Sequence, residues 1–156
     1  MNQKITLCCD TKKLWEIAKF SLWIKTSDDS RFISDKIIDE NSYKVLRWRD
    51  TFRYVYIFWW EYIWYKPKMM MEKVWAWPRN LKDFLKEKLI FKEIWKSIQC
   101  VYDNQWLLWN DTVNILFDVN EHFQIKFLML ILNSVFVDYW YKNNFSSGLH
   151  IKINQL

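Results

Sequence analysis

A chain of 156 residues with 51% hydrophobic and 26% charged side chains is long enough to bury the core of one domain. This composition excludes a disordered polymer, and the net charge of +5 favours an acidic partner such as RNA or an anionic membrane surface. The longest uncharged run is residues 127–137, whereas a membrane-spanning helix needs about 20 apolar residues. We therefore expect a single domain over residues 1–156 that does not span a membrane.

The first forty residues predict one strand and two helices. Residues 4–9 (KITLCC) alternate weakly and favour a short strand, and a helix is expected from Asp10 or Thr11 to about Lys25. The polar connector 26–30 (TSDDS) carries a capping signal, and a short helix is expected over residues 31–40.

Residues 43–65 form the stretch around which the chain is organised. Apolar residues recur there at gaps of three and four, as on one face of a helix: Val45, Trp48, Phe52, Val55, Trp59 and Tyr62. Asn41 and Ser42 supply a cap and Pro67 a stop, so we predict a helix with Trp59 and Val55 buried and Arg49 exposed. A strand over residues 52–65 is the alternative, because aromatic residues also favour strands.

The second half of the chain predicts further helices. After the brief segment 68–77, Asn80 is expected to cap an amphipathic helix over residues 81–101. A tryptophan-rich link over 103–110 leads to a long apolar segment, 112–141, with a bend expected near Asn120 or Asn133–Ser134. The last residues, LHIKINQL, alternate like a strand that pairs with KITLCC. These elements predict a mainly α fold of four to five helices around an aromatic core, with or without a small sheet from the termini, and an α+β fold is the alternative.

No motif for catalysis is present. A single Gly excludes a phosphate-cradling loop or a dinucleotide fingerprint, and CxxC, HExxH and GxSxG are absent. Glu61 lies among tryptophans, where desolvation favours acid–base chemistry, but pairing with a Lys, an Arg or a Tyr hydroxyl is the preferred interpretation. We expect no enzyme, metal, cofactor or small-molecule substrate. The three cysteines, Cys8, Cys9 and Cys100, suit a reduced compartment rather than a disulfide framework.

Two sets of residues are candidates for contact with partners. Basic side chains beside tryptophans suit RNA, because arginine holds phosphates and indole rings stack on bases. A solvated rim around the core is the alternative. The candidate RNA-binding residues are Arg47, Arg49, Arg53, Arg79, Lys82, Lys86 and Lys96. The candidate protein-interface residues are Trp75, Trp77, Trp106 and Trp109, since exposed apolar patches mark contact sites.

The residue usage also suggests a genetic origin. Gly, Pro, Ala and Arg, with GC-rich codons, are scarce, whereas Phe, Tyr, Ile, Asn and Lys are abundant. Twelve Trp are unexpected in an AT-rich gene unless UGA also encodes Trp, as in many mitochondria and in mollicute bacteria. By composition along its whole length, without a shared motif, the chain resembles the ciliate-type mitochondrially encoded ymf proteins.

That resemblance implies membership of a large organellar assembly. The favoured hypothesis is a non-enzymatic structural subunit of a mitochondrial ribosome in the matrix, which contacts rRNA and neighbouring subunits. The alternatives are an accessory subunit of a respiratory complex, and a small stand-alone bacterial or phage protein-binding module in the bacterial cytoplasm.

Overall fold

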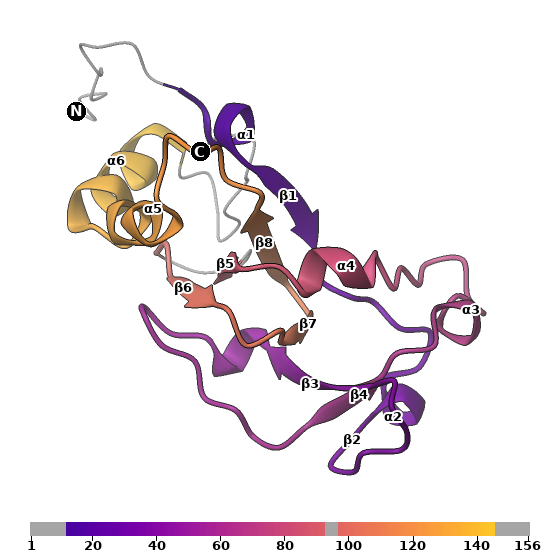
Figure 1. Cartoon of the computed structure of the whole chain (residues 1–156). Coiled ribbons are helices and arrows are strands. Elements are labelled where there is room, and N and C mark those ends of the chain that lie inside the picture. The colour runs from indigo at the N-terminus through magenta and orange to yellow at the C-terminus, as the bar shows by residue number, and fades with distance from the viewer. Residues whose placement is uncertain (1–11, 93–96, 146–156) are drawn as a thin grey trace.

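The computed structural model describes residues 12–92 and 97–145 of the chain (Figure 1). Most of the helices in this part are single turns, and only α5 and α6 are longer. The helices are α1 Leu14–Ile17, α2 Asp29–Phe32, the 3-10 helix η1 Trp48–Asp50, α3 Pro67–Met70, α4 Leu81–Phe84, α5 Ile125–Leu132 and α6 Val135–Phe145. The strands are β1 Lys19–Leu22, β2 Ile33–Ser34, β3 Ser42–Arg47, β4 Tyr62–Trp64, β5 Lys88–Lys92, β6 Cys100–Asp103, β7 Leu108–Asn110 and β8 Val113–Phe117.

The first sheet has the strand order β1-β8-β5-β6, and every pair in it is antiparallel. Its two central strands, β5 and β8, are buried along their whole length. Successive side chains on a strand point to opposite faces. Ile90 and Ile115 therefore lie on one face of this sheet, and Leu89 and Leu116 on the other.

The second sheet has the order β2-β4-β3-β7 and combines antiparallel pairs with one parallel pair, β3 with β7. Two isolated bridges continue it beyond β7. Ile24 pairs with Asn110 in parallel, and Lys25 pairs with Trp77 in antiparallel fashion. Trp77 thus lies at the end of a row of paired backbone that begins at β2.

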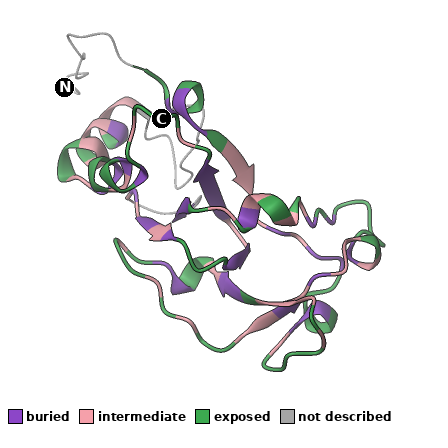
Figure 2. Cartoon of the chain, viewed as in Figure 1, coloured by how far each residue is buried: buried purple, intermediate pink, exposed green. Residues whose placement is uncertain are grey.

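Hydrophobic side chains fill two layers, one on each side of the first sheet. Ile90, Ile115 and Val101 meet Val45 and Trp109 of the second sheet in one cluster. On the other face, Leu89 and Leu116 belong to a cluster with apolar residues of α1, α5 and α6. Figure 2 shows this arrangement as buried strands in the interior and exposed outer surfaces on α5 and α6.

The expected mainly α fold is wrong, because the described residues form an α+β structure with two four-stranded sheets. The central stretch is not a helix: residues 43–65 contribute strand β3, the 3-10 helix η1, a long loop and strand β4. Trp59 and Val55, expected to be buried, lie in that loop with 62% and 53% of their surface exposed, whereas Arg49 is exposed as expected. The α+β alternative is confirmed, although its strand over residues 52–65 is reduced to Tyr62–Trp64.

The other long helices are also wrong in part. The expected helix 81–101 ends at Phe84 and gives way to β5 and then β6, and the segment 112–141 begins as strand β8. The helix expected up to Lys25 includes β1 instead, and the one expected over 31–40 includes β2. The break at Asn133–Ser134 is confirmed, since α5 ends and α6 begins there. The strands expected at KITLCC and LHIKINQL lie outside the described residues. No helix in the described part of the chain is long and apolar enough to cross a membrane.

Candidate nucleic-acid interface

The segment that follows α3 presents two tryptophan rings on a fixed backbone. The Lys25 N–H donates to the Trp77 carbonyl at 2.9 Å, and the Trp77 N–H donates to the Lys25 carbonyl at 2.7 Å. Before this pairing the chain makes a turn, in which the Ala76 N–H donates to the Lys73 carbonyl at 3.0 Å. Ala76 is buried, and its neighbours Trp75 and Trp77 point outward with 46% and 53% of their surfaces exposed. The backbone pairing therefore holds Trp77 at the surface, and the turn closed by Lys73 and Ala76 holds Trp75.

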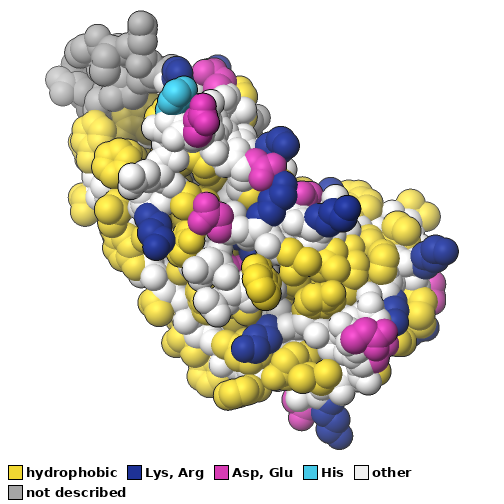
Figure 3. All heavy atoms as spheres, viewed as in Figure 1, with side chains coloured by type: hydrophobic (Ala, Val, Ile, Leu, Met, Phe, Trp, Pro, Cys, Tyr) yellow, Lys and Arg dark blue, Asp and Glu magenta, His cyan; other side chains and the backbone are white. Residues whose placement is uncertain are grey.

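Cations lie over both rings. The Nζ atoms of Lys25 and Lys73 lie 5.2 and 5.3 Å from the ring centre of Trp75. The guanidinium carbon of Arg79 lies 5.3 Å from that of Trp77. Such cation–π contacts are favourable at these distances. We call these five residues the tryptophan–cation corner; it adjoins α3, at the end of the molecule remote from α6, where hydrophobic and basic side chains lie side by side in Figure 3.

The charge of the corner is largely uncompensated. In the part of the chain that the structure describes, Lys25, Lys73 and Arg79 form no salt bridge with a carboxylate. The neighbouring Glu72 pairs with Arg31 at 2.9 Å. The pKa of the exposed Asp28 is lowered, mainly because its carboxylate accepts a hydrogen bond from the Ser30 hydroxyl and to a smaller extent by the charge of Lys73. A positive potential beside exposed rings suits a phosphate-bearing ligand.

A pocket of about 450 Å³ opens beside the Trp77 ring. It is lined by Pro67, Met71, Trp77, Pro78 and Arg79. The Arg79 backbone has φ of 59°, a region that glycine favours, and its carbonyl accepts a hydrogen bond from the Tyr65 hydroxyl at 2.6 Å. Tyr65 is itself buried, and burial raises its pKa, so this hydroxyl keeps its proton and remains a donor. The buried Tyr65 thus fixes the backbone of Arg79, which lines one side of the pocket.

The arginines expected to bind RNA around residues 47–53 form an ion-pair network. Arg47 Nε lies 2.9 Å from Glu61 Oε2, and Arg49 lies 3.6 Å from both Glu61 and Asp50. Arg53 donates to the carbonyl of Ile98 at 3.3 Å. The expectation that Glu61 pairs with a basic side chain is therefore confirmed. This network neutralises much of the charge that the sequence suggested was free.

The remaining candidate cations are dispersed. Arg79 lies in the tryptophan–cation corner, Lys82 is exposed on α4, and Lys86 lies 2.7 Å from Asp118. Lys96 lies outside the described residues. The expected lysine-rich helix face does not form, since its helix is one turn long. Lys25 and Lys73 were missed as site residues, although Lys73, Trp75 and Trp77 are close neighbours in the sequence before Pro78.

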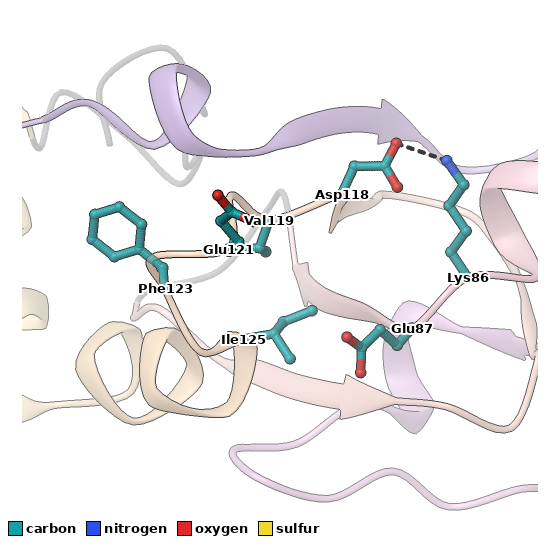
Figure 4. Close-up of a pocket in the computed structure, with 7 residues that line it drawn as sticks. All are labelled: Lys86, Glu87, Asp118, Val119, Glu121, Phe123 and Ile125. Carbon is teal, nitrogen blue, oxygen red and sulfur yellow. Dashed lines mark hydrogen bonds and ion pairs between the residues drawn. The ribbon is translucent and has the colours of Figure 1, made fainter.

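A second pocket, of about 490 Å³, lies near the start of α5 (Figure 4). Its lining residues are Lys86, Glu87, Asp118, Val119, Glu121, Phe123 and Ile125. Asp118 accepts hydrogen bonds from Lys86 at 2.7 Å and Lys19 at 3.0 Å, which lower its pKa. Glu87 accepts one from Tyr102, and the carboxylates of Glu87 and Glu121 point in different directions. The described residues contain no group of three His, Cys, Asp or Glu side chains suited to a metal ion.

The four candidate interface tryptophans have different environments. Trp75, Trp77 and Trp106 are exposed, Trp106 by 65%. Trp109 is completely buried, with its ring edge-on to Tyr56 at a centroid distance of 6.2 Å, and it belongs to the core between the sheets. Contact with a partner through the three exposed rings stays a prediction.

A basic surface interleaved with exposed aromatic rings is typical of nucleic-acid-binding domains. Residues 16–156 match the TaqI-like C-terminal specificity domain, and the chain belongs to this family. No curated protein matches the chain. The family match contradicts the resemblance to mitochondrially encoded proteins, and with it the ribosomal or respiratory subunit and the rRNA partner. The mitochondrial matrix as the location has no support from it. Composition misled because residue usage reflects codon bias, which unrelated genes share.

Proposed function

We propose that this chain recognises double-stranded DNA as the specificity domain of a restriction–modification enzyme. The observation that carries the proposal is the tryptophan–cation corner in a chain of the TaqI-like specificity family. In this proposal the domain is not catalytic: it supplies binding, and a methyltransferase or restriction part of the enzyme supplies the chemistry. The bacterial cytoplasm, the alternative location expected from the sequence, suits this function.

The corner has the two parts that DNA binding requires. Lys25, Lys73 and Arg79 offer charge to phosphates, and binding to phosphates supplies most of the affinity for any DNA sequence. Specificity comes from groups that reach base edges. The backbone pairing between Lys25 and Trp77 fixes the cations and rings relative to each other. The corner therefore presents them as one unit.

Salt dependence of DNA binding tests the proposal. For a labelled duplex, the log–log slope of affinity against salt concentration changes by about 0.9 for each phosphate contact. The triple variant Lys25→Gln, Lys73→Gln, Arg79→Gln should therefore flatten the slope by up to about 2.7. The matched control is Lys19→Gln, Lys86→Gln, Lys142→Gln, which removes the same charge from lysines already paired with carboxylates.

Fluorescence anisotropy supplies both slopes, and circular dichroism checks that the variants fold. Equal flattening in the two triple variants would show that net charge alone binds DNA. Absence of binding at low salt would refute DNA recognition altogether.

Protein binding is the second function that a specific observation favours. The outer surfaces of α5 and α6 expose a set of large apolar side chains: Phe127, Leu130, Ile131, Val135, Phe136 and Tyr139. Apolar patches of this kind mark contact sites on soluble proteins. A hydrophobic dye should bind the isolated chain, and Phe127→Glu with Phe136→Glu should reduce dye binding while leaving DNA affinity within about twofold. Unchanged dye binding would show that this surface is not the apolar site.

A further inference from the structure

We propose that the pocket beside Trp77 binds one unpaired nucleotide of a DNA strand, with its base stacked on the indole ring and its phosphate held by Arg79. This inference rests on the proposed DNA recognition and adds that the corner prefers DNA with an unpaired nucleotide. The pocket, of about 450 Å³, is an open recess on the surface, a shape that admits a nucleotide still joined to its strand.

The chemistry of the lining selects a flat, weakly polar group next to an anion. Four of the five lining residues are apolar, and none is acidic. The Trp77 ring is the broadest apolar surface among them, and every nucleobase has a ring face that stacks on an indole. A base inside a duplex presents only its edges to a protein, so its ring face reaches Trp77 only after leaving the stack.

Arg79 supplies the anionic half of the site. Its guanidinium lies over one face of the Trp77 ring, so the base stacks on the other face and the cation remains beside it. Its Nε is buried and has no hydrogen-bond partner within the described residues. A planar guanidinium binds phosphate oxygens through parallel N–H bonds. A nucleotide whose base rests on Trp77 therefore places its phosphate within reach of Arg79, the one charged side chain among the lining residues.

The pocket is formed before any ligand arrives. Trp77 is held by its two backbone bonds with Lys25, and the Arg79 carbonyl by the Tyr65 hydroxyl. Met70, next to the lining residue Met71, is completely buried in the core. Ligands bind more tightly to sites whose ordering has already been completed by folding.

The test compares three ligands with the wild-type chain: a perfect duplex, the same duplex with one bulged 2-aminopurine, and free dAMP. We expect the bulged duplex to bind about tenfold more tightly than the perfect one, as for one stacked base, and the 2-aminopurine fluorescence to be quenched by Trp77. Free dAMP should bind much more weakly than the bulged duplex.

Substitutions assign the effect to the pocket. Trp77→Ala should abolish both the preference and the quenching, while Trp77→Phe, which keeps an aromatic face and guards against loss of fold, should keep part of both. Trp106→Ala removes an even more exposed ring outside the pocket, 65% against 53%, and should change neither.

The outcomes separate the two proposals. Equal binding of the two duplexes, or a preference that survives Trp77→Ala, refutes the nucleotide pocket and leaves DNA recognition standing. Failure of both duplexes to bind refutes DNA recognition. Binding of free dAMP as tight as that of the bulged duplex refutes the DNA strand as the source of the nucleotide.

Discussion

Breaking the ion pair between Lys88 and Asp103 tests how the neighbouring strands β5 and β6 of the first sheet are held together. The two residues are register partners on β5 and β6, their Nζ and Oδ2 atoms lie 2.6 Å apart, and both side chains are completely buried. Asp103→Asn leaves the Lys88 ammonium without a counter-charge in the interior. Loss of one partner of a buried pair costs about 3–5 kcal/mol. At roughly 2–4 °C per kcal/mol for a chain of this size, the Tm should fall by about 6–20 °C.

The stability that Asp103→Asn loses should depend on pH, and the pKa of Lys88 decides whether the loss grows or shrinks as the pH rises. Burial lowers the pKa of Lys88, and the charge of Asp103 partly opposes that shift. Because the folded-state pKa is below the unfolded one, the folded chain releases this proton first, and stability rises with pH between the two values. Asp103→Asn removes the opposing charge and widens that interval. The difference in the free energy of unfolding between the wild type and Asp103→Asn should therefore shrink as the pH is raised from 7 toward the ordinary lysine pKa of about 10.4.

Urea unfolding at several pH values measures the effect, and an exposed pair supplies the control. Glu72→Gln makes the same carboxylate-to-amide change in the pair with Arg31, where exposed pairs contribute about 0–1 kcal/mol. Replacing both buried partners, Lys88→Met with Asp103→Leu, should restore much of the lost stability, since well-packed apolar substitutes for buried pairs are often neutral. A loss for Asp103→Asn equal to that for Glu72→Gln would refute the argument.

Two further predictions concern packing, and urea unfolding measures both. Trp109→Ala should cost about 3–5 kcal/mol because its ring is completely buried, whereas Trp59→Ala, in an exposed loop position, should change stability by about 0.5 kcal/mol or less; similar losses would contradict the layer between the sheets. Asn133→Ala should cost about 2–4 kcal/mol. The Asn133 side-chain amide accepts from the Cys100 N–H at 2.8 Å and donates to the Cys100 carbonyl at 2.7 Å. The substitution would leave the Cys100 N–H buried without its Asn133 partner. The control Asn143→Ala loses one bond on half-exposed α6, and an equal effect would contradict the role of Asn133.

Sequence patterns correctly predicted features that depend on neighbouring residues, such as helix caps. Asn80 caps α4 as expected, its side chain accepting from the Lys82 N–H at 3.1 Å. The polar connector before α2 also caps it, through Asp28. The pairing of Glu61 with arginine could be anticipated because a carboxylate among aromatic rings needs a counter-charge.

The sheets could not be predicted in the same way. Strand β1 pairs with β8, so Lys19 lies opposite Phe117, nearly a hundred positions away, and no local pattern encodes such a pairing. Strand β5 is buried on both faces and therefore lacks the alternation that identifies a half-buried strand. The helix expected over residues 81–101 instead included the whole of this strand. Lys25 was missed as part of the tryptophan–cation corner for the same reason, because it meets Trp77 only through the bridge between their segments.

The scarcity of glycine explains why the turns were hidden, and it bears on the site. Seven non-glycine residues of the described chain have positive φ: Tyr54, Trp60, Arg79, Trp106, Asp111, Thr112 and Asp118. Asp111 and Thr112 turn the chain between β7 and β8, where a glycine would have signalled the end of a strand. Aspartate tolerates this conformation, but large side chains such as those of Trp60, Trp106 and Arg79 adopt it only when their surroundings hold them there. At Arg79 the surroundings are identifiable, since the Tyr65 hydroxyl binds its carbonyl and Pro78 precedes it. The strained backbone thus coincides with the pocket in which we place the nucleotide, and local strain of this kind is concentrated at ligand sites.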